Sequence, residues 1–228
     1  MFRSEIYRPG SEQTAALNAH YQDLHHAAFP GFVKPDYFAE LKRDVDDLLA
    51  FRRRRDFLME CMDNSPRRMN VVNGHIIEQN SRLIPALYNN PAIIEFLSSV
   101  IGEQVLPLHD DIDRYVINQL QMTSDTFGAH YDDYPISFVI ILESPGIEGG
   151  GYAEMVPRSH SLSQLDENPI RLPLKAMDAY VLKTDTTAHR VAPLKQDTLR
   201  TAINFAYTTP SFVPPRITDS ASKLYAEA

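Results

Sequence analysis

One histidine and two aspartates lie within four positions of the stretch GAHYDDYP, residues 128–135. If this stretch is extended, His130 and Asp132 point to one face and Asp133 to the other, because successive side chains of a strand alternate. An imidazole nitrogen and a carboxylate oxygen on one face can bind the same metal ion. Such a triplet is also common in turns and on surfaces, so the metal hypothesis depends on a further ligand elsewhere in the chain.

The third ligand is expected on another strand. His160 lies in the loop-like segment VPRSHS, whereas His189 begins HRVAPL, after the strand-like segment DAYVL and a turn. We therefore predict His189 as the ligand and expect His160 to orient a neighbour or to face solvent. A second histidine-rich stretch, HYQDLHH at 20–26, lacks the ligand spacing of zinc sites, and we interpret its histidines as surface or packing residues.

Two histidines and one carboxylate bind one side of a ferrous ion and leave its other positions open for a cosubstrate and dioxygen. The HExxH spacing that is typical of zinc enzymes is absent. Arg200 follows His189 after ten intervening residues, within the strand-like segment TLRTAINFAYT. A buried guanidinium needs a carboxylate partner, and a cosubstrate could supply one.

The combined pattern resembles the iron(II)/2-oxoglutarate-dependent dioxygenases of the double-stranded β-helix fold. The pattern consists of HYD at 130–132, His189 after 56 intervening residues, and Arg200. The resemblance covers roughly residues 105–210. It implies that His130, Asp132 and His189 hold iron(II), that 2-oxoglutarate chelates the iron, and that Arg200 pairs with the 5-carboxylate of 2-oxoglutarate. The segment VPRSH is also similar to a Pro-x-Ser-His loop of some members.

Within that superfamily, the helical N-terminal half, the segment HYDDYPISFVIILESP and the later NFAY are most similar to small enzymes that hydroxylate or chlorinate free amino acids, notably the lysine halogenase and hydroxylase group. The halogenating members carry a small residue in place of the metal-binding carboxylate, which leaves a position for chloride. Asp132 is present here, so hydroxylation is favoured over chlorination.

Five residues are candidates for binding the substrate. Arg67 or Arg68 could clamp a carboxylate, Asp113 and Asp133 could receive an amine, and Asn204 is placed like a polar substrate contact of the group. Each has a simpler interpretation: a solvent-exposed charge for either arginine, a loop carboxylate for Asp113, a turn cap for Asp133 and a sheet-edge amide for Asn204.

The elements that position these residues can be predicted from periodicity. Apolar spacing predicts helices from about residue 36 to 49 and from 91 to 101, the second with Asn90 as N-cap and Gly102 as terminator. Short apolar or alternating segments predict strands at 115–122, 136–142, 152–156, 179–182, 189–191 and 201–207. We expect an α+β jelly roll in one domain, residues 1–228, with a mainly helical part at 1–104, a catalytic core at 105–210 and a surface extension at 211–228.

Composition narrows the class of protein. The 228 residues carry a formal net charge of -8, which disfavours nucleic acid as a partner, and the run FRRRRDF at 51–57 is interpreted as a solvated helix face. A single cysteine, Cys61, and the lack of an apolar N-terminal stretch favour a cytoplasmic protein. No apolar run approaches the ~20 residues that span a bilayer. The sequence is also compatible with a homodimer.

The function expected from these observations is hydroxylation of an unactivated C–H bond of a small polar metabolite, such as a free amino acid, with iron(II), 2-oxoglutarate and dioxygen, and with release of succinate and CO2. Desaturation, cyclisation or action on a larger natural-product intermediate are alternatives within the same chemistry. A cupin-like binding protein without turnover is an alternative of another class, but it would have no need of Arg200.

Overall fold

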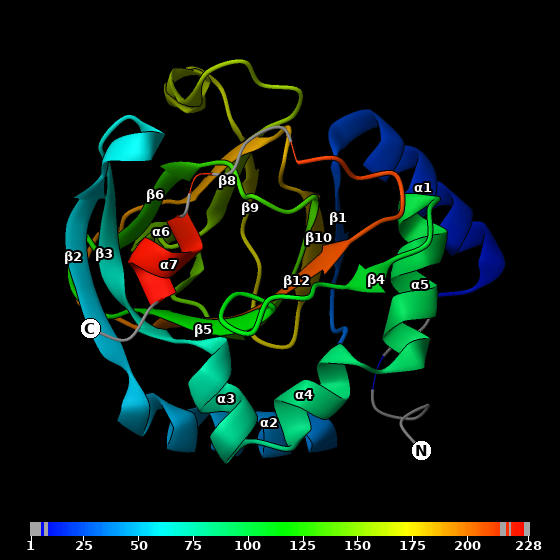
Figure 1. Ribbon diagram of the computed structural model, residues 1–228, viewed down its shortest axis with the longest axis horizontal. Coiled ribbons are helices and arrows are strands. Elements are labelled where there is room, and N and C mark those ends of the chain that lie inside the picture. Colours follow the sequence, from blue (N-terminus) through cyan, green and yellow to red (C-terminus); the bar gives the residue numbers. More distant parts are fainter. Residues whose placement is uncertain (1–5, 7–8, 215–217, 219, 226–228) are drawn as a thin grey trace.

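The computed structural model describes residue 6, residues 9–214, residue 218 and residues 220–225. Its centre is a curled antiparallel sheet of the jelly-roll (double-stranded β-helix) type, and helices pack against the outside of this sheet (Figure 1). The predicted α+β jelly roll is therefore confirmed.

The sheet is formed by twelve described strands. They are β1 (His26–Phe29), β2 (Arg53–Met59), β3 (Ser65–Val72), β4 (Leu106–Pro107), β5 (Tyr115–Leu120), β6 (Thr126–His130), β7 (Ile136–Glu143), β8 (Ala153–Val156), β9 (Ile170–Leu172), β10 (Ala179–Lys183), β11 (Ala188–Val191) and β12 (Arg200–Thr208). Their order is β1-β10-β7-β12-β5-β3-β6-β11-β8-β9, with β2 paired to β3 and β4 paired to β12.

The helices lie mainly in the first half of the chain. They are α1 (Ser11–Leu24), α2 (Pro35–Leu48), α3 (Gly74–Asn80), α4 (Leu83–Tyr88), α5 (Pro91–Ile101), α6 (Gly146–Gly149) and α7 (Ser220–Tyr225), with short 3-10 turns η1 (Leu49–Phe51), η2 (Glu60–Met62) and η3 (Leu162–Asp166). Helices α2, α3 and α4 lie together below the sheet in Figure 1, and α1 packs beside α5. In the described residues, no helix combines the length and the apolar character needed to cross a bilayer.

Strand β7 shows why the apolar run at 136–142 has no polar face. Phe138 and Ile140 pack in the cluster formed with the helices, whereas Val139 and Ile141 belong to the cluster inside the barrel. Because the helices cover the outer face, both faces of this central strand are buried. The chain therefore places apolar residues at every one of these positions.

The predicted strands and helices agree with the structure to within a few residues at their ends. The strand-like segments from 115 onward correspond to β5, β7, β8, β10, β11 and β12. For α5, the Asn90 side chain accepts a hydrogen bond from the Ala92 N–H (2.9 Å), and Gly102 ends the helix at a φ of 81°. Both caps therefore act as their residue types predicted.

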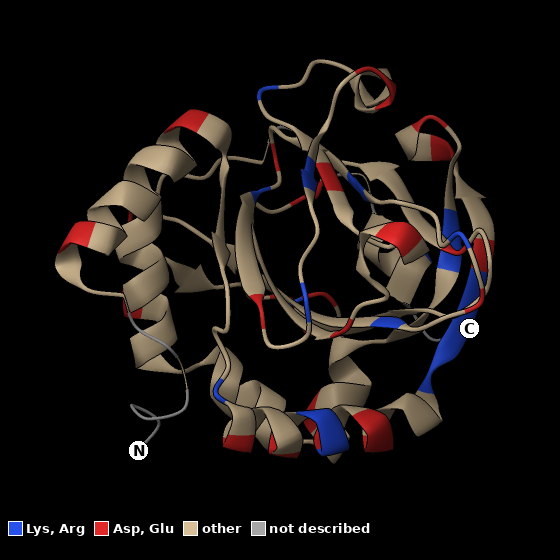
Figure 2. Ribbon diagram, turned by 180° about the vertical axis from the view of Figure 1, so that it is seen from behind, with Lys and Arg blue, Asp and Glu red and all other residues tan. Residues whose placement is uncertain are grey.

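The mainly helical part also contributes three strands that periodicity did not reveal. The arginine run at 51–57 was expected on a helix, but most of it forms the edge strand β2 (Figure 2), whose one partner among the described strands is β3. The charged residues of the run are largely exposed, as predicted. Exposed and less exposed residues alternate, as expected for a strand and not for a helix. Strand β3 then pairs with both β5 and β6, so the helical part and the core share one sheet.

The tail was expected at the surface, and residues 211–214 are largely exposed, but helix α7 is packed into the protein. Helix α7 lies beside β3 and buries Leu224 and Tyr225, and Asn73 Nδ2 donates a hydrogen bond to the Tyr225 carbonyl oxygen (2.8 Å). The remaining positions of the predicted extension, 215–217, 219 and 226–228, lie outside the described residues.

Candidate metal centre

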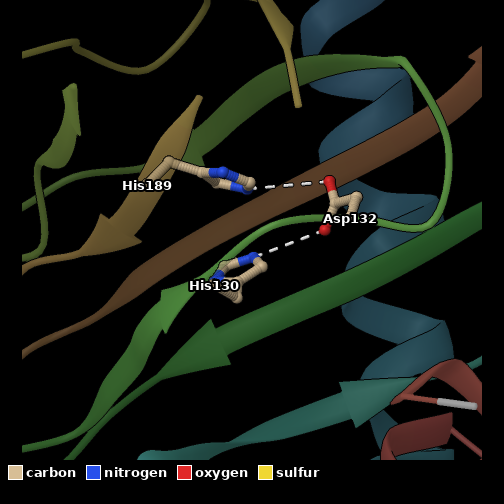
Figure 3. Close-up of side chains that lie close together, drawn as sticks. All are labelled: His130, Asp132 and His189. Atoms are coloured by element: carbon tan, nitrogen blue, oxygen red, sulfur yellow. Dashed lines mark ion pairs between the residues drawn. The ribbon is translucent and has the colours of Figure 1, made fainter. Parts of the chain in front are cut away.

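Two antiparallel strands bring the metal-ligand candidates together. His130 at the end of β6 lies directly opposite His189 on β11, and their ring centroids are 4.0 Å apart. Asp132 completes the group from the segment just after β6, with Oδ1 3.5 Å from His130 Nε2 and Oδ2 3.6 Å from His189 Nε2 (Figure 3). Strand β6 ends at His130, so Asp132 reaches the site from a loop. The sequence had predicted both residues on one face of a strand.

Hydrogen bonds fix which nitrogen of each histidine is free. His130 Nδ1 lies 2.7 Å from the Gly128 carbonyl oxygen, and His189 Nδ1 lies 3.0 Å from the Thr187 carbonyl oxygen. A carbonyl only accepts, so each Nδ1 carries the proton and each Nε2 keeps its lone pair for a metal. Burial, reinforced by the charges of His189 and Arg67, lowers the pKa of His130 well below its usual range, which favours the neutral imidazole.

The donor set fits one metal ion. One ligand atom from each of His130, Asp132 and His189 lies within 4.8 Å of the other two, and no second group of this kind occurs in the part of the chain that the structure describes. His160 is exposed in its loop and takes no part, as predicted. In the N-terminal histidine stretch, His20 and His26 contact each other at 3.4 Å, which agrees with a packing role.

A cavity extends from the triad to Arg200, and we call it the Arg200 chamber. Alternation along β12 turns Arg200, Ala202 and Asn204 into this chamber, while Ile203 and Phe205 pack toward the helices. The Arg200 guanidinium is buried, hydrogen-bonds to the Tyr180 hydroxyl and leaves its Nε without a partner.

Arg200 is therefore a buried cation in need of an anion. Burial lowers its pKa, and only the hydrogen bond and negative potential of Tyr180 oppose this. Among the described residues, no carboxylate lies within ion-pair distance of its guanidinium. A carboxylate of a bound molecule would complete the pairing, so the chamber fits 2-oxoglutarate.

A second cavity shares Phe127, His130 and Asp132 with the first, and we call it the Arg67 chamber. The Arg67 side chain is almost fully buried over the Phe127 ring (4.9 Å) and donates to Ser65 Oγ (2.7 Å). It forms no ion pair with a described carboxylate, and burial lowers its pKa to about 10. Asp113 and Asp133 line the same chamber.

Asp113, like Arg67, is a buried ionisable group in this chamber. Its carboxyl group has no cationic partner among the described residues. Burial, together with the negative charges of Asp132, Asp110 and Asp133, raises the pKa of Asp113 well above its usual range. The folded protein therefore binds this proton more tightly than the unfolded chain does. The contribution of Asp113 to stability is fully present below its ordinary carboxyl pKa of about 4 and is lost as the pH rises through its raised pKa in the folded protein.

Asp113→Asn is expected to stabilise the substrate-free protein at pH ~7.5, because it removes a buried charge that no group compensates. A gain of about 1 kcal/mol corresponds to about 2–4 °C in Tm for a chain of this length. Thermal unfolding at several pH values measures the effect, and the gain should shrink toward pH ~4. The matched control is Asp111→Asn, since Asp111 is mostly exposed; an equal gain there would contradict the explanation.

The other substrate candidates lie in different environments. Arg68 points away from both chambers, because it alternates with Arg67 on β3, and it pairs with Asp56 on the exposed face. Asn204 lines the Arg200 chamber, where it accepts a hydrogen bond from Ser137 and donates one to the Tyr134 hydroxyl (2.9 Å). Asp133 accepts its hydrogen bonds from the C-terminal segment.

Several site residues could not be predicted from the sequence. Tyr180, Ser137 and Asn118 line the Arg200 chamber, and Tyr134 and Tyr225 line the Arg67 chamber. Only Tyr134, four residues after His130, carried a signal in its closeness to the HYD motif. The others are ordinary strand or helix residues whose chamber position depends on how distant strands pair.

A curled jelly roll with a His-x-Asp…His triad beside a buried arginine defines an iron(II)/2-oxoglutarate-dependent oxygenase, with iron and 2-oxoglutarate as its cofactors. The family model of halogenase D, HalD, matches residues 10–225, and the chain belongs to this family. No curated protein matches the chain in sequence.

Solved structures agree on the fold. The epimerase SnoN, in complex with Fe3+, alpha ketoglutarate and nogalamycin RO, superposes with a TM-score of 0.71 at 16% identity over 93% of this chain and 89% of its own. The carbocyclase SnoK from nogalamycin biosynthesis gives 0.69 at 13% identity over 95% and 90%. A 2OG-Fe(II) oxygenase family protein from Burkholderia pseudomallei gives 0.61 at 18% identity over 93% and 100%.

Proposed function

We propose that this protein hydroxylates an unactivated C–H bond of a small free amino acid that carries a second cationic group, with conversion of 2-oxoglutarate and dioxygen to succinate and CO2. The observation that carries the proposal is the position of the triad. The triad lies where two chambers meet. Among the described residues, Arg200 in the first chamber has no carboxylate partner, and Arg67 and Asp113 in the second have no oppositely charged partner.

The Arg200 chamber would hold the cosubstrate. A guanidinium can bind a carboxylate through two parallel hydrogen bonds, and the orphaned Nε of Arg200 is available for one of them. Tyr180 supports the same end of the chamber. The 2-oxoglutarate molecule would therefore be fixed by the triad at one end and by Arg200 at the other.

The Arg67 chamber would hold the amino acid. Arg67 is placed to bind the carboxylate, and Asp113 and Asp133 to bind ammonium groups. A buried charge without a counter-charge is costly, so a zwitterion with an additional positive charge would supply the opposite charges that Arg67, Asp113 and Asp133 lack among the described residues. This arrangement keeps Arg67, Asp113 and Asp133 as proposed substrate residues and leaves Asn204 as a support for the cosubstrate side.

When bound, iron(II) supplies dioxygen activation, and the residues of this chain position the substrate and exclude water. Met59, Met62 and Leu224 form the apolar part of the Arg67 chamber, and Phe127 lies between the chambers. The apolar surface favours a site in which a carbon atom faces the metal while the charged ends of the molecule are held by the polar groups.

Asp132 favours hydroxylation over chlorination. Its two oxygens face His130 and His189, so the carboxylate takes the position and supplies the negative charge that a halide would otherwise bring. The family model bears the name of a halogenase, but this chain retains the carboxylate. We therefore propose the hydroxylase reaction for this member.

The test is a screen of free amino acids with iron(II), 2-oxoglutarate, dioxygen and excess chloride, read by mass spectrometry. We expect a product heavier by one oxygen atom, formed from an amino acid with a cationic side chain, and no product with a chlorine isotope pair. A chlorinated product would overturn the assignment of Asp132 as a ligand. A product lighter by two hydrogen atoms would replace hydroxylation by desaturation or cyclisation.

A further inference from the structure

The C-terminal segment closes one side of the Arg67 chamber. Helix α7 lies beside β3 (Figure 1), and its residues line the chamber together with Phe127 and His130 of β6. These α7 residues are Ser220, Ala221, Leu224 and Tyr225. The chain thus returns to the proposed substrate site about ninety residues after the HYD motif. Asp133, next to the triad, contacts the segment that leads into α7.

Asp133 holds this segment through one of its two oxygens. Oδ2 accepts hydrogen bonds from Thr218 Oγ1 (2.7 Å), from the Thr218 N–H (3.2 Å) and from Ser220 Oγ (3.5 Å). No described group donates to Oδ1, and Asp133 is only partly buried at the chamber wall. The carboxylate therefore has one oxygen bound to the C-terminal segment and one oxygen left for another donor.

We propose that Thr218 is a positioning residue: by binding Asp133 Oδ2 it orients the carboxylate for a cationic group of the substrate and couples the docking of α7 to substrate binding. This inference rests on the proposed function, because it assumes that the Arg67 chamber receives the amino acid.

The coupling has to act in both directions. If a docked α7 increases the affinity for the substrate by some factor, the substrate stabilises the docked α7 by the same factor. Hydrogen bonds to a charged group are stronger than neutral ones, so losing the Thr218 hydroxyl is expected to change the affinity about tenfold. Because Thr218 acts through Asp133, losing its hydroxyl should weaken the binding of a substrate with a second ammonium group strongly and that of a substrate without this group little.

The exposed Lys223 provides a direct readout of docking, since trypsin can cut after it only when α7 opens. We would measure cleavage after Lys223 by mass spectrometry in the iron(II)- and 2-oxoglutarate-loaded protein without dioxygen. The probes are L-lysine and its neutral analogue L-norleucine. For the wild-type protein we expect L-lysine to protect this site more strongly than L-norleucine does.

Thr218→Val is expected to increase cleavage after Lys223 and to raise the L-lysine concentration needed for half-maximal protection about tenfold. Thr218→Ser keeps the hydroxyl and should behave as wild type in both measurements. Thr123→Val is the matched control, because the Thr123 N–H and Oγ1 both donate to Asp197 Oδ1 on the surface (2.8 and 2.7 Å). It should behave as wild type. In turnover, Thr218→Val should raise the KM for the amino acid and leave the KM for 2-oxoglutarate unchanged.

The outcomes separate the two proposals. If L-lysine protects the wild type and Thr218→Val equally, the inference about Thr218 is overturned and the proposed function stands. If no amino acid of the screen is bound or converted by the wild-type protein, the proposed function fails, and the inference fails with it. Equal protection by L-lysine and L-norleucine would show that Asp133 does not bind a cationic group.

Discussion

His189→Ala is expected to abolish iron binding and to reduce turnover to background. Residues that merely support a metal ligand are worth about 10–100-fold in metal affinity, so the loss of one of three ligands should cost more than ~100-fold. The remaining ligands, His130 and Asp132, would bind the ion from one strand end only. Iron content after equilibrium dialysis, together with succinate formation, measures both effects.

His160→Ala is the matched control for this experiment, because His160 is exposed in a loop and outside the ligand group. It should retain iron and activity. Circular dichroism would confirm that both variants fold. If His160→Ala lost iron while His189→Ala kept it, the ligand assignment would be wrong.

Arg200→Met is expected to raise the KM for 2-oxoglutarate by about 30-fold or more, because truncating one partner of a buried charge pair costs roughly 2–5 kcal/mol. The KM for the amino acid should change far less, since Arg200 does not line the Arg67 chamber. Arg200→Lys should recover little of the lost affinity for 2-oxoglutarate, because an ammonium group cannot reproduce the bidentate geometry of a guanidinium.

Thermal unfolding separates binding from folding in this variant. Without 2-oxoglutarate, Arg200→Met should be at least as stable as the wild type, because an unpaired buried guanidinium is removed. Added 2-oxoglutarate should raise the Tm of the wild type and not that of the variant. Arg171→Ala, which removes a largely exposed arginine paired with Glu154, is the control and should keep the response. An unchanged 2-oxoglutarate dependence of Arg200→Met would refute the proposed role.

The sequence by itself determined the features whose cause is local. Caps and apolar spacing located α2 and α5, and segments of strand-like residues located β7 and β12, because these patterns depend on neighbours a few positions away. The ligand types and their spacing pointed to His130, Asp132 and His189, and the structure places them together.

Only the tertiary structure decided features that depend on pairing between distant segments. Arg67 and Arg68 were equivalent in the sequence, but alternation on β3 turns Arg67 into a chamber and Arg68 to solvent. Strand β3 itself was missed, since it is specified by its pairing with β5 and β6 more than by its own pattern.

The two chambers likewise depend on long-range contacts. Tyr180 meets Arg200 because β10 and β12 both pair with β7, and Tyr225 reaches the Arg67 chamber because α7 packs on β3. Nothing in the local sequence of the tail distinguishes a docked helix from a surface extension. Burial of Leu224 and Tyr225 supplies the free energy for docking, and that burial exists only once the sheet has formed.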